Sequence, residues 1–175
     1  MISTPRLKLF PLTISHLKTG LVSINEMSDI INISLVPTLF AGVVQRAVSM
    51  KIEKMDKEPI ELHEWFTYWL IVIKEANIGG GLVGYKGSPD SNGSVEIGYG
   101  LDENFRGQGY MSEAVKAMLT WAFSHSGCNV VTATNVLKSN FASQKVLQNN
   151  RFILRSESEE GINFILTKQN FKSES

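Results

Sequence analysis

The sequence has 175 residues, 43% of them hydrophobic, which suits one well-packed domain and is short for two. Its 17 Lys and Arg residues balance its 17 Asp and Glu residues, so no bulk charge attracts a nucleic acid or a membrane surface. The first residues lack the apolar core of a signal peptide, and no later run approaches the roughly 20 apolar residues that span a bilayer. We therefore expect a single domain over residues 1–175, located in the cytoplasm, with no nucleic acid and no membrane among its partners. The only cysteine, Cys128, is flanked by Gly127 and Asn129, without the His or Cys partners of a nucleophile or metal site, and is expected to be a structural thiol.

The first third of the chain predicts an edge strand followed by helices. Residues 6–10 alternate polar and apolar side chains, and Thr13 is a suitable N-cap for a helix over residues 14–24. The stretch from Asn25 to Ile60 is less regular, and we expect one or two helices there, including one over residues 38–52.

The middle of the chain predicts an antiparallel meander. Residues 61–66 favour a short helix, and the aromatic and β-branched residues 69–73 favour a strand. A turn at residues 75–77 leads to two further strands, over 78–85 and 94–101. The run IGGGLVG in the first of these two strands is followed by a turn and not by a helix, so it is no dinucleotide fingerprint. Its glycines instead predict a bulge or a close approach between strands.

The last third of the chain predicts a strand between two helices and then a hairpin. Apolar residues at helical spacing place a helix over residues 110–126, and a strand over 130–134 follows. Because a helical crossover joins this strand to the preceding one, the two are expected to be parallel. A helix over 140–149 precedes strand-like residues 152–156 and 162–166, which predict a terminal hairpin, and only the last few residues are expected to be disordered.

The run DENFRGQGYM, from Asp102 to Met111, joins a central strand to a helix. The first turn of a helix leaves N–H groups unpaired, and two close glycines let such donors approach an anion. Together with Arg106, the loop predicts a phosphate site, although an ordinary surface turn that caps the helix explains the loop alone equally well. No Walker lysine, G-x-S-x-G elbow or complete zinc motif accompanies it, so we expect neither a P-loop nor a hydrolase nor a metal site.

Polar residues on either side of the loop make the pattern more specific. Glu96 lies on the strand before the loop, and Asn140 and Ser143 lie at the start of the later helix. The segment VEIGYGLDENFRGQGYMSEAVKAMLTWAF resembles the acetyl-CoA-binding core of the GNAT N-acetyltransferases, whose loop is Arg/Gln-x-x-Gly-x-Gly/Ala. The outer segments STPRLKLFPLTISHL and SNFASQKVLQNNRF resemble those of its RimJ/RimL-like branch, which acetylates ribosomal-protein N-termini. The resemblance covers roughly residues 4–167.

The resemblance implies a fold and a donor substrate. The implied fold is the α/β (α+β) GNAT fold, a mixed central sheet of about seven strands flanked by helices, with an antiparallel N-terminal meander and splayed parallel central strands. Acetyl-CoA would be the acetyl donor, and a bulge would turn an N–H of Tyr99 or Gly100 toward the thioester oxygen. The implied coenzyme-binding residues are Gly98, Tyr99, Gly100, Leu101, Arg106, Gly107, Gln108, Gly109, Tyr110, Met111, Ser112, Asn140 and Ser143.

Two positions, Glu96 and Ser143, match catalytic residues of the family. An amine attacks a thioester only when unprotonated, whereas a lysine amine has a pKa of about 10.4 and a chain N-terminus about 8. Glu96 resembles the family's strand-borne base, and Ser143 the hydroxyl beside the thioester sulfur. Each has a plainer alternative: Glu96 as a solvated carboxylate, Ser143 as a first-turn helix hydroxyl, and likewise Asn140 as only an N-cap. Arg106 is alternatively a solvated loop cation.

The sequence also departs from the family pattern. No tyrosine follows Asn140 in its helix at the position of the usual acid. Arg151 replaces the usual glycine, so we expect Asn149 or Asn150 to end this helix in the left-handed conformation. Trp65, Tyr68 and Trp69 are candidates for an acceptor pocket, or else core residues.

The predicted function is an acetyl-CoA-dependent N-acetyltransferase that acts on a primary amine, either a protein N-terminus or a small molecule. Two alternatives stay open: a non-catalytic acyl-CoA-binding or sensing module, and a site for another phosphorylated ligand such as a nucleotide. Many relatives form homodimers, which makes a second copy a candidate partner. The sequence does not fix the amine, the general acid or the role of residues 25–60.

Overall fold

A computed structural model describes residues 1–172, which form one large mixed sheet with helices on both faces. The strands are β1 (Ile2–Ser3), β2 (Leu7–Pro11), β3 (Ser34–Leu35), β4 (Tyr68–Ile73), β5 (Ile78–Tyr85), β6 (Ser94–Leu101), β7 (Val130–Val136), β8 (Ile153–Glu157) and β9 (Ile162–Thr167). The helices are α1 (Ile14–Val22), α2 (Ile24–Ile31), α3 (Val43–Met55), α4 (His63–Phe66), α5 (Tyr110–Ser124), α6 (Phe141–Asn149) and α7 (Lys168–Lys172), with 3-10 turns η1 (Ile60–Leu62) and η2 (Glu103–Phe105). Within residues 1–172, no helix has the length and apolar character needed to cross a membrane.

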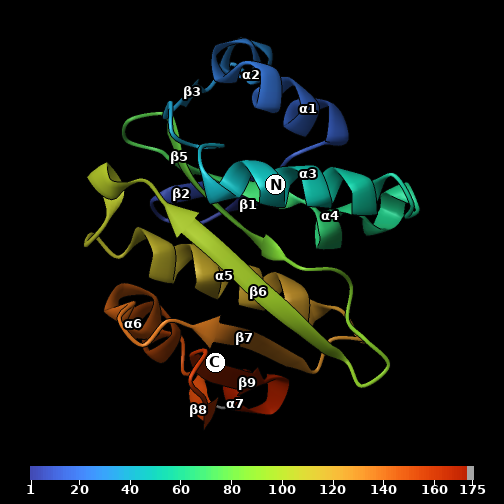
Figure 1. The fold of residues 1–175 in the computed structure, drawn as a ribbon, viewed down its shortest axis with the longest axis vertical. Helices are drawn as coiled ribbons and strands as arrows, with labels where there is room; N and C mark the ends of the chain where they lie inside the picture. Colours follow the sequence, from blue (N-terminus) through green and yellow to red (C-terminus); the bar gives the residue numbers. More distant parts are fainter. Residues whose placement is uncertain (173–175) are drawn as a thin grey trace.

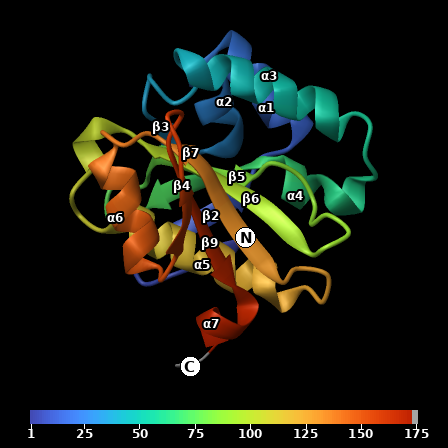
Figure 2. The ribbon, with the colours of Figure 1, turned by 60° about the horizontal axis from the view of Figure 1, so that its bottom comes forward.

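The sheet has the strand order β1-β2-β4-β5-β6-β7-β9-β8, with β3 paired to β5. Strands β4, β5 and β6 form the predicted antiparallel meander. Strand β2, predicted as an edge strand, pairs antiparallel with β4 and also with the short strand β1, which takes the edge. Helices α1, α2 and α3 cover one face of the sheet, and α5 covers the other (Figures 1 and 2). Each face has its own apolar core because the side chains of each strand alternate between the two faces.

Strands β6 and β7 are parallel, as predicted, but they pair over only part of their length. Residues Ser94 to Glu96 pair with Val130 to Thr132, and the register contains no β7 partner for residues 97–101. The two strands therefore separate toward their carboxyl ends. This is the splay that the family resemblance implied, and it opens a gap beside the second half of β6.

The glycine run of β5 forms a bulge, which confirms its structural interpretation. The register with β4 shifts so that Ile71 faces Gly81 while Val72 faces Gly79, and Gly80 is the extra residue. A Cβ on Gly80 would lie 2.5 Å from Cδ2 of Phe105, which belongs to the loop after β6. The missing side chain thus lets this loop pack directly on the sheet.

Several local expectations were wrong. Helix α3 begins at Val43 and not at Thr38, because Leu39 and Phe40 turn into the core and Gly42 takes a positive φ of 59°. Strand β6 pairs with β5 in an unbroken register, so the bulge expected near Tyr99 is absent.

The end of helix α6 and the end of the chain also differ from expectation. Arg151 itself takes the left-handed conformation, with a φ of 64°, so neither Asn149 nor Asn150 provides that turn. The sequence did not predict α7. The disorder expected at the end of the chain falls on residues 173–175, outside the described residues.

Candidate active site

The loop between β6 and α5 has a backbone suited to an anion. Gly107 and Gly109 have φ values of 74° and 79°, in the left-handed region that glycine adopts without a steric penalty. Arg106 and Gly107 form the centre of a turn, and within the described residues the N–H groups of residues 109–112 donate to no acceptor. They lie at the N-terminal end of α5, where the helix dipole favours negative charge.

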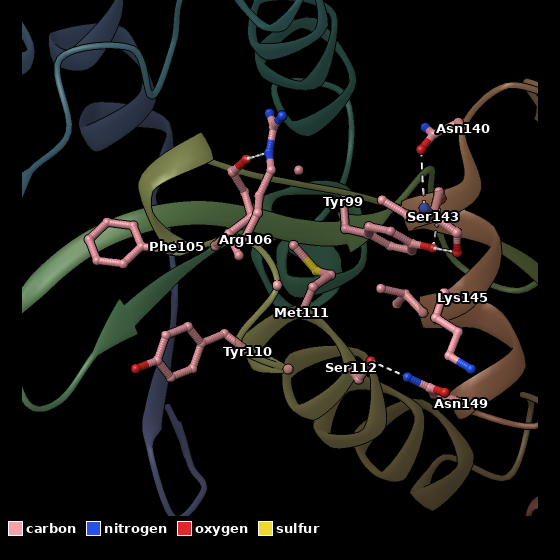
Figure 3. A pocket seen from close by; sticks show the side chains of 16 residues that line it. Tyr99, Phe105, Arg106, Tyr110, Met111, Ser112, Asn140, Ser143, Lys145 and Asn149 are labelled. Carbon is pink, nitrogen blue, oxygen red and sulfur yellow. Dashed lines mark hydrogen bonds between the residues drawn. The ribbon is translucent and has the colours of Figure 1, made fainter.

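These N–H groups border a cavity of about 570 Å³, which we call the α5–α6 cavity. Its walls come from the end of β6, the glycine loop and the facing sides of α5 and α6 (Figure 3). Its lining residues are Tyr99, Gly100, Leu101, Phe105, Arg106, Gly107, Gly109, Tyr110, Met111, Ser112, Asn140, Ala142, Ser143, Lys145, Val146 and Asn149. Arg106 and Lys145 supply positive charge, and Arg106 Nε donates to the Leu101 carbonyl at 3.0 Å.

Three polar side chains meet at the start of α6. The Asn140 side chain accepts a hydrogen bond from the Ser143 N–H at 3.1 Å, so Asn140 caps the helix. The Ser143 hydroxyl lies 2.9 Å from the Tyr99 hydroxyl across the gap between β6 and α6 (Figure 3). Burial raises the pKa of Tyr99 to about 12, although the hydrogen bond with Ser143 acts in the opposite direction. Tyr99 therefore keeps its proton at neutral pH.

Glu96 lies on the opposite face of β6 from Tyr99, because the two residues are three positions apart in a strand. Its Oε1 accepts hydrogen bonds from Lys86 Nζ at 2.5 Å and from the Thr134 hydroxyl at 2.6 Å. The side chain keeps 23% of its surface exposed. Glu96 and Ser143, the two predicted catalytic residues, thus lie on different sides of one strand.

A second cavity of about 460 Å³ lies on the Glu96 side of β6, and we call it the α3 cavity. Its lining residues are Val36, Thr38, Leu39, Val44, Tyr68, Gly80, Gly81, Leu82, Gly98, Tyr99, Gly100, Leu101, Asp102, Glu103 and Arg106. The end of β6 and Arg106 line both cavities, so the strand separates the two spaces. The Thr38 hydroxyl donates to Asp102 at 2.6 Å and, as the main cause, lowers the pKa of that carboxyl.

The structure brings together most of the predicted site residues in the α5–α6 cavity. Three lie elsewhere: Gly98 lines only the α3 cavity, Gln108 lines neither, and Glu96 lines neither. Of the aromatic candidates for an acceptor pocket, only Tyr68 lines the α3 cavity, whereas Trp65 and Trp69 are core residues.

Sequence reasoning missed five residues of the α5–α6 cavity. Four of them, Ala142, Lys145, Val146 and Asn149, recur at spacings of three and four and so share one face of α6. That periodicity was available in the sequence as a signal. The fifth, Phe105, had no such signal because its position depends on the bulge at Gly80.

Fold and site together define a class of protein. The mixed sheet contains one parallel pair of strands, β6 and β7, that separates toward its carboxyl ends. A loop suited to an anion leads from β6 into α5. This arrangement is the one found in the GNAT acetyltransferases. A sequence profile described as the Acetyltransferase (GNAT) domain matches residues 6–153. The chain therefore belongs to the GNAT acetyltransferase family.

Individual relatives agree with this assignment. The uncharacterised N-acetyltransferase YjdG of Bacillus subtilis (strain 168) is 37% identical over 95 residues, which are 54% of this chain and 56% of that protein. The chain spans about half the length of the curated relatives it matches.

Two solved structures share the fold over nearly the whole chain. One is RimL, described as a ribosomal L7/L12 alpha-N-protein acetyltransferase in complex with coenzyme A, with a TM-score of 0.66, 19% identity and coverage of 95% of this chain and 97% of that one. The other is the ribosomal-protein-S5-alanine acetyltransferase of Vibrio fischeri, with a TM-score of 0.66, 18% identity and 98% of each chain covered. At such identities the likeness shows the fold alone.

Proposed function

We propose that this protein moves the acetyl group of acetyl-CoA to a primary amine. The observation that supports this most directly is the run of unpaired N–H groups over residues 109–112, which borders the α5–α6 cavity. Coenzyme A has a doubly charged pyrophosphate, and backbone donors at a helix N-terminus suit such an anion. Arg106 and Lys145 add positive charge to the same cavity, and the gap beside β6 leaves room for the pantetheine arm.

Ser143 is the proposed hydrogen-bond donor to the departing sulfur. Acetyl-CoA supplies the acetyl group as a thioester, so a thiolate leaves when the amine is acetylated. The Ser143 hydroxyl lies in the α5–α6 cavity and is held by Tyr99, whose raised pKa keeps it protonated. The Tyr99 hydroxyl also lies 3.2 Å from the Ser143 carbonyl, which is a second acceptor for its proton. In the proposed reaction the Tyr99 proton is donated to the Ser143 Oγ, so that the Ser143 hydroxyl proton is available for the sulfur.

Glu96 is the proposed base on the acceptor side. An amine reaches the site mainly as an ammonium ion and must lose a proton before it attacks. Lys86 and Thr134 both bind Oε1 of Glu96, which fixes the carboxylate, while Oε2 takes part in neither bond. In this proposal Oε2 accepts the proton of the amine, through water that connects Glu96 to the α3 cavity.

The Tyr99 N–H is the proposed donor to the thioester oxygen. The Asp102 N–H donates to the Gly80 carbonyl, and the Glu96 backbone carbonyl accepts from the Lys86 N–H. The backbone groups of the even-numbered residues of β6 therefore form hydrogen bonds with β5. Backbone groups alternate along a strand, so those of Tyr99 face the opposite edge, where β7 has separated. A preorganised backbone donor of this kind typically contributes a hundredfold to a thousandfold to the rate.

The α3 cavity is the proposed acceptor site. It has apolar walls from Val36, Leu39 and Val44, and carboxylates from Asp102 and Glu103 that attract an ammonium group. The names of the two solved relatives describe acetylation of ribosomal proteins, which makes an N-terminal amine our first choice of acceptor and a small-molecule amine the second.

Two measurements test the proposed function. Acetyl-CoA is expected to raise the melting temperature, and a thiol-release assay over amines and N-terminal peptides is expected to detect turnover. Glu96→Gln is expected to lower kcat by about a hundredfold to ten-thousandfold while leaving the affinity for acetyl-CoA nearly unchanged. Absence of stabilisation by acetyl-CoA refutes the proposal, and an unchanged rate for Glu96→Gln across pH refutes the role of Glu96.

A further inference from the structure

The segment before β2 contacts the back of the glycine loop. Arg6 Nη1 donates to the Gln108 carbonyl at 2.8 Å, and Arg6 Nε donates to Glu113 Oε2 at 2.7 Å. The Arg6 backbone N–H and the Thr4 hydroxyl both donate to Glu113 Oε1, at 2.9 and 2.6 Å. The Arg6 guanidinium also lies 4.6 Å from the centre of the Tyr110 ring. Residues more than a hundred positions apart in sequence thus form one network around the loop.

The contact with the Gln108 carbonyl fixes the direction of the next N–H group. In a trans peptide the carbonyl of one residue and the N–H of the following residue point in opposite directions, and no peptide bond of the described chain is cis. Because the Gln108 carbonyl points to Arg6, the Gly109 N–H points away from Arg6. Gly109 lines the α5–α6 cavity and Arg6 does not, so this N–H is directed to the cavity side of the loop.

Gly109 and Glu113 fit this arrangement. A Cβ on Gly109 would lie 3.3 Å from Arg6 Nη2, so the missing side chain leaves space for the guanidinium. Burial alone would raise the pKa of Glu113, but hydrogen bonds from Thr4 and Arg6 and the charge of Arg6 outweigh burial and lower it. Glu113 is therefore a carboxylate at neutral pH, able to hold Arg6 in place.

We propose that Arg6, oriented by Glu113, is a positioning residue that aims the 108–109 peptide at the pyrophosphate of acetyl-CoA and so sets the affinity for the coenzyme. This inference rests on the proposed function, because it takes coenzyme A as the ligand of the loop. Arg6 acts through the backbone, from behind the loop, and does not touch the ligand.

A simple charge effect predicts a different outcome. If Arg6 only attracted the phosphates through space, Arg6→Lys would preserve binding, and removal of the negative charge of Glu113 would tighten it. If Arg6 positions the peptide, both changes weaken binding, because lysine cannot bond Glu113 and Gln108 with the same fork of donors. The effect of Glu113→Gln thus has opposite signs under the two explanations.

The test is isothermal titration of coenzyme A into the wild-type protein, Arg6→Lys, Glu113→Gln and the control Lys8→Gln. Lys8 is exposed on β2, two residues after Arg6, and its change removes one charge without touching the network. We expect about a tenfold rise in Kd for Arg6→Lys and a severalfold rise for Glu113→Gln, with Lys8→Gln unchanged. KM for acetyl-CoA should rise in parallel, while kcat at saturating acetyl-CoA and KM for the amine stay within about twofold.

Three results distinguish the proposals. Tighter binding by Glu113→Gln, or unchanged binding by both network variants, overturns the positioning role of Arg6. Glu113→Gln keeps the side-chain size and decides the question by itself if Arg6→Lys does not fold. A wild-type protein that fails to bind coenzyme A refutes the proposed function, whereas normal wild-type binding with unaffected variants refutes only the role of Arg6.

Discussion

Lys51 is a buried amine on α3, and its pKa leads to a prediction about stability and pH. Its Nζ donates to the Phe66 and Tyr85 carbonyls at 2.8 and 2.7 Å and lies 4.5 Å from the centre of the Tyr68 ring. Burial, with smaller contributions from the charges of Lys54 and Lys86, lowers the pKa of Lys51 from 10.5 to about 7. Folding therefore makes protonation of this amine less favourable.

The sign and size of the effect follow from proton linkage. Between pH 7 and 10.5 the unfolded state holds the Lys51 proton and the folded state has largely lost it, so the free energy of unfolding rises with pH over this window. Below pH 7 both states are protonated, and the full cost of the buried charge is present. At about 1.4 kcal/mol per pH unit, the rise from pH 7 to 9 is about 2 kcal/mol, since the folded-state titration is still incomplete at pH 7.

The assay compares urea unfolding of the wild-type protein and Lys51→Met at pH 7, 8 and 9. The absolute stability of the variant also reflects two carbonyls that lose their donor, so the informative quantity is the pH dependence of the difference between the two proteins. We expect the wild-type protein to gain about 2 kcal/mol relative to Lys51→Met over this range. The exposed Lys57→Met is the control and should show no such trend. Parallel pH profiles for the wild-type protein and Lys51→Met would refute the lowered pKa.

Two further changes test the site and the helix that supports it. Tyr99→Phe removes the partner of the Ser143 hydroxyl, and we expect kcat to fall by about tenfold or more with little change in KM for acetyl-CoA. An equal loss of kcat in Ser143→Ala and in the double variant would show that the two hydroxyls act as a unit. Full activity of Tyr99→Phe would remove Tyr99 from the mechanism. Arg151→Gly relieves a left-handed backbone, and we expect the free energy of unfolding to rise by about 1 kcal/mol in urea titrations. A fall would show that contacts of the Arg151 side chain outweigh the backbone cost.

Local signals in the sequence predicted much of the fold. Turn residues on either side of β5 and β6 marked both strands with correct ends, because Gly, Pro, Asn and Ser clusters show where a strand stops. Thr13 caps α1 as expected, since its hydroxyl accepts the His16 N–H that the helix leaves unpaired. The predicted start of helix α3 was wrong, because the burial of Leu39 and Phe40 outweighed the local helical pattern before Gly42.

Some features of the candidate site also follow from local sequence signals, whereas others depend on the tertiary structure. Left-handed glycines and a helix start are local properties, so the sequence by itself predicted that residues 106–112 form a loop suited to an anion, and the resemblance to the family suggested coenzyme A pyrophosphate as that anion. Side chains from distant segments are not local properties. Only the tertiary structure placed Ser143 against Tyr99, Thr134 against Glu96, and Arg6 behind the Gln108 carbonyl. These contacts depend on how the sheet is ordered and where β6 and β7 separate, and no short-range pattern encodes a distance across the sheet.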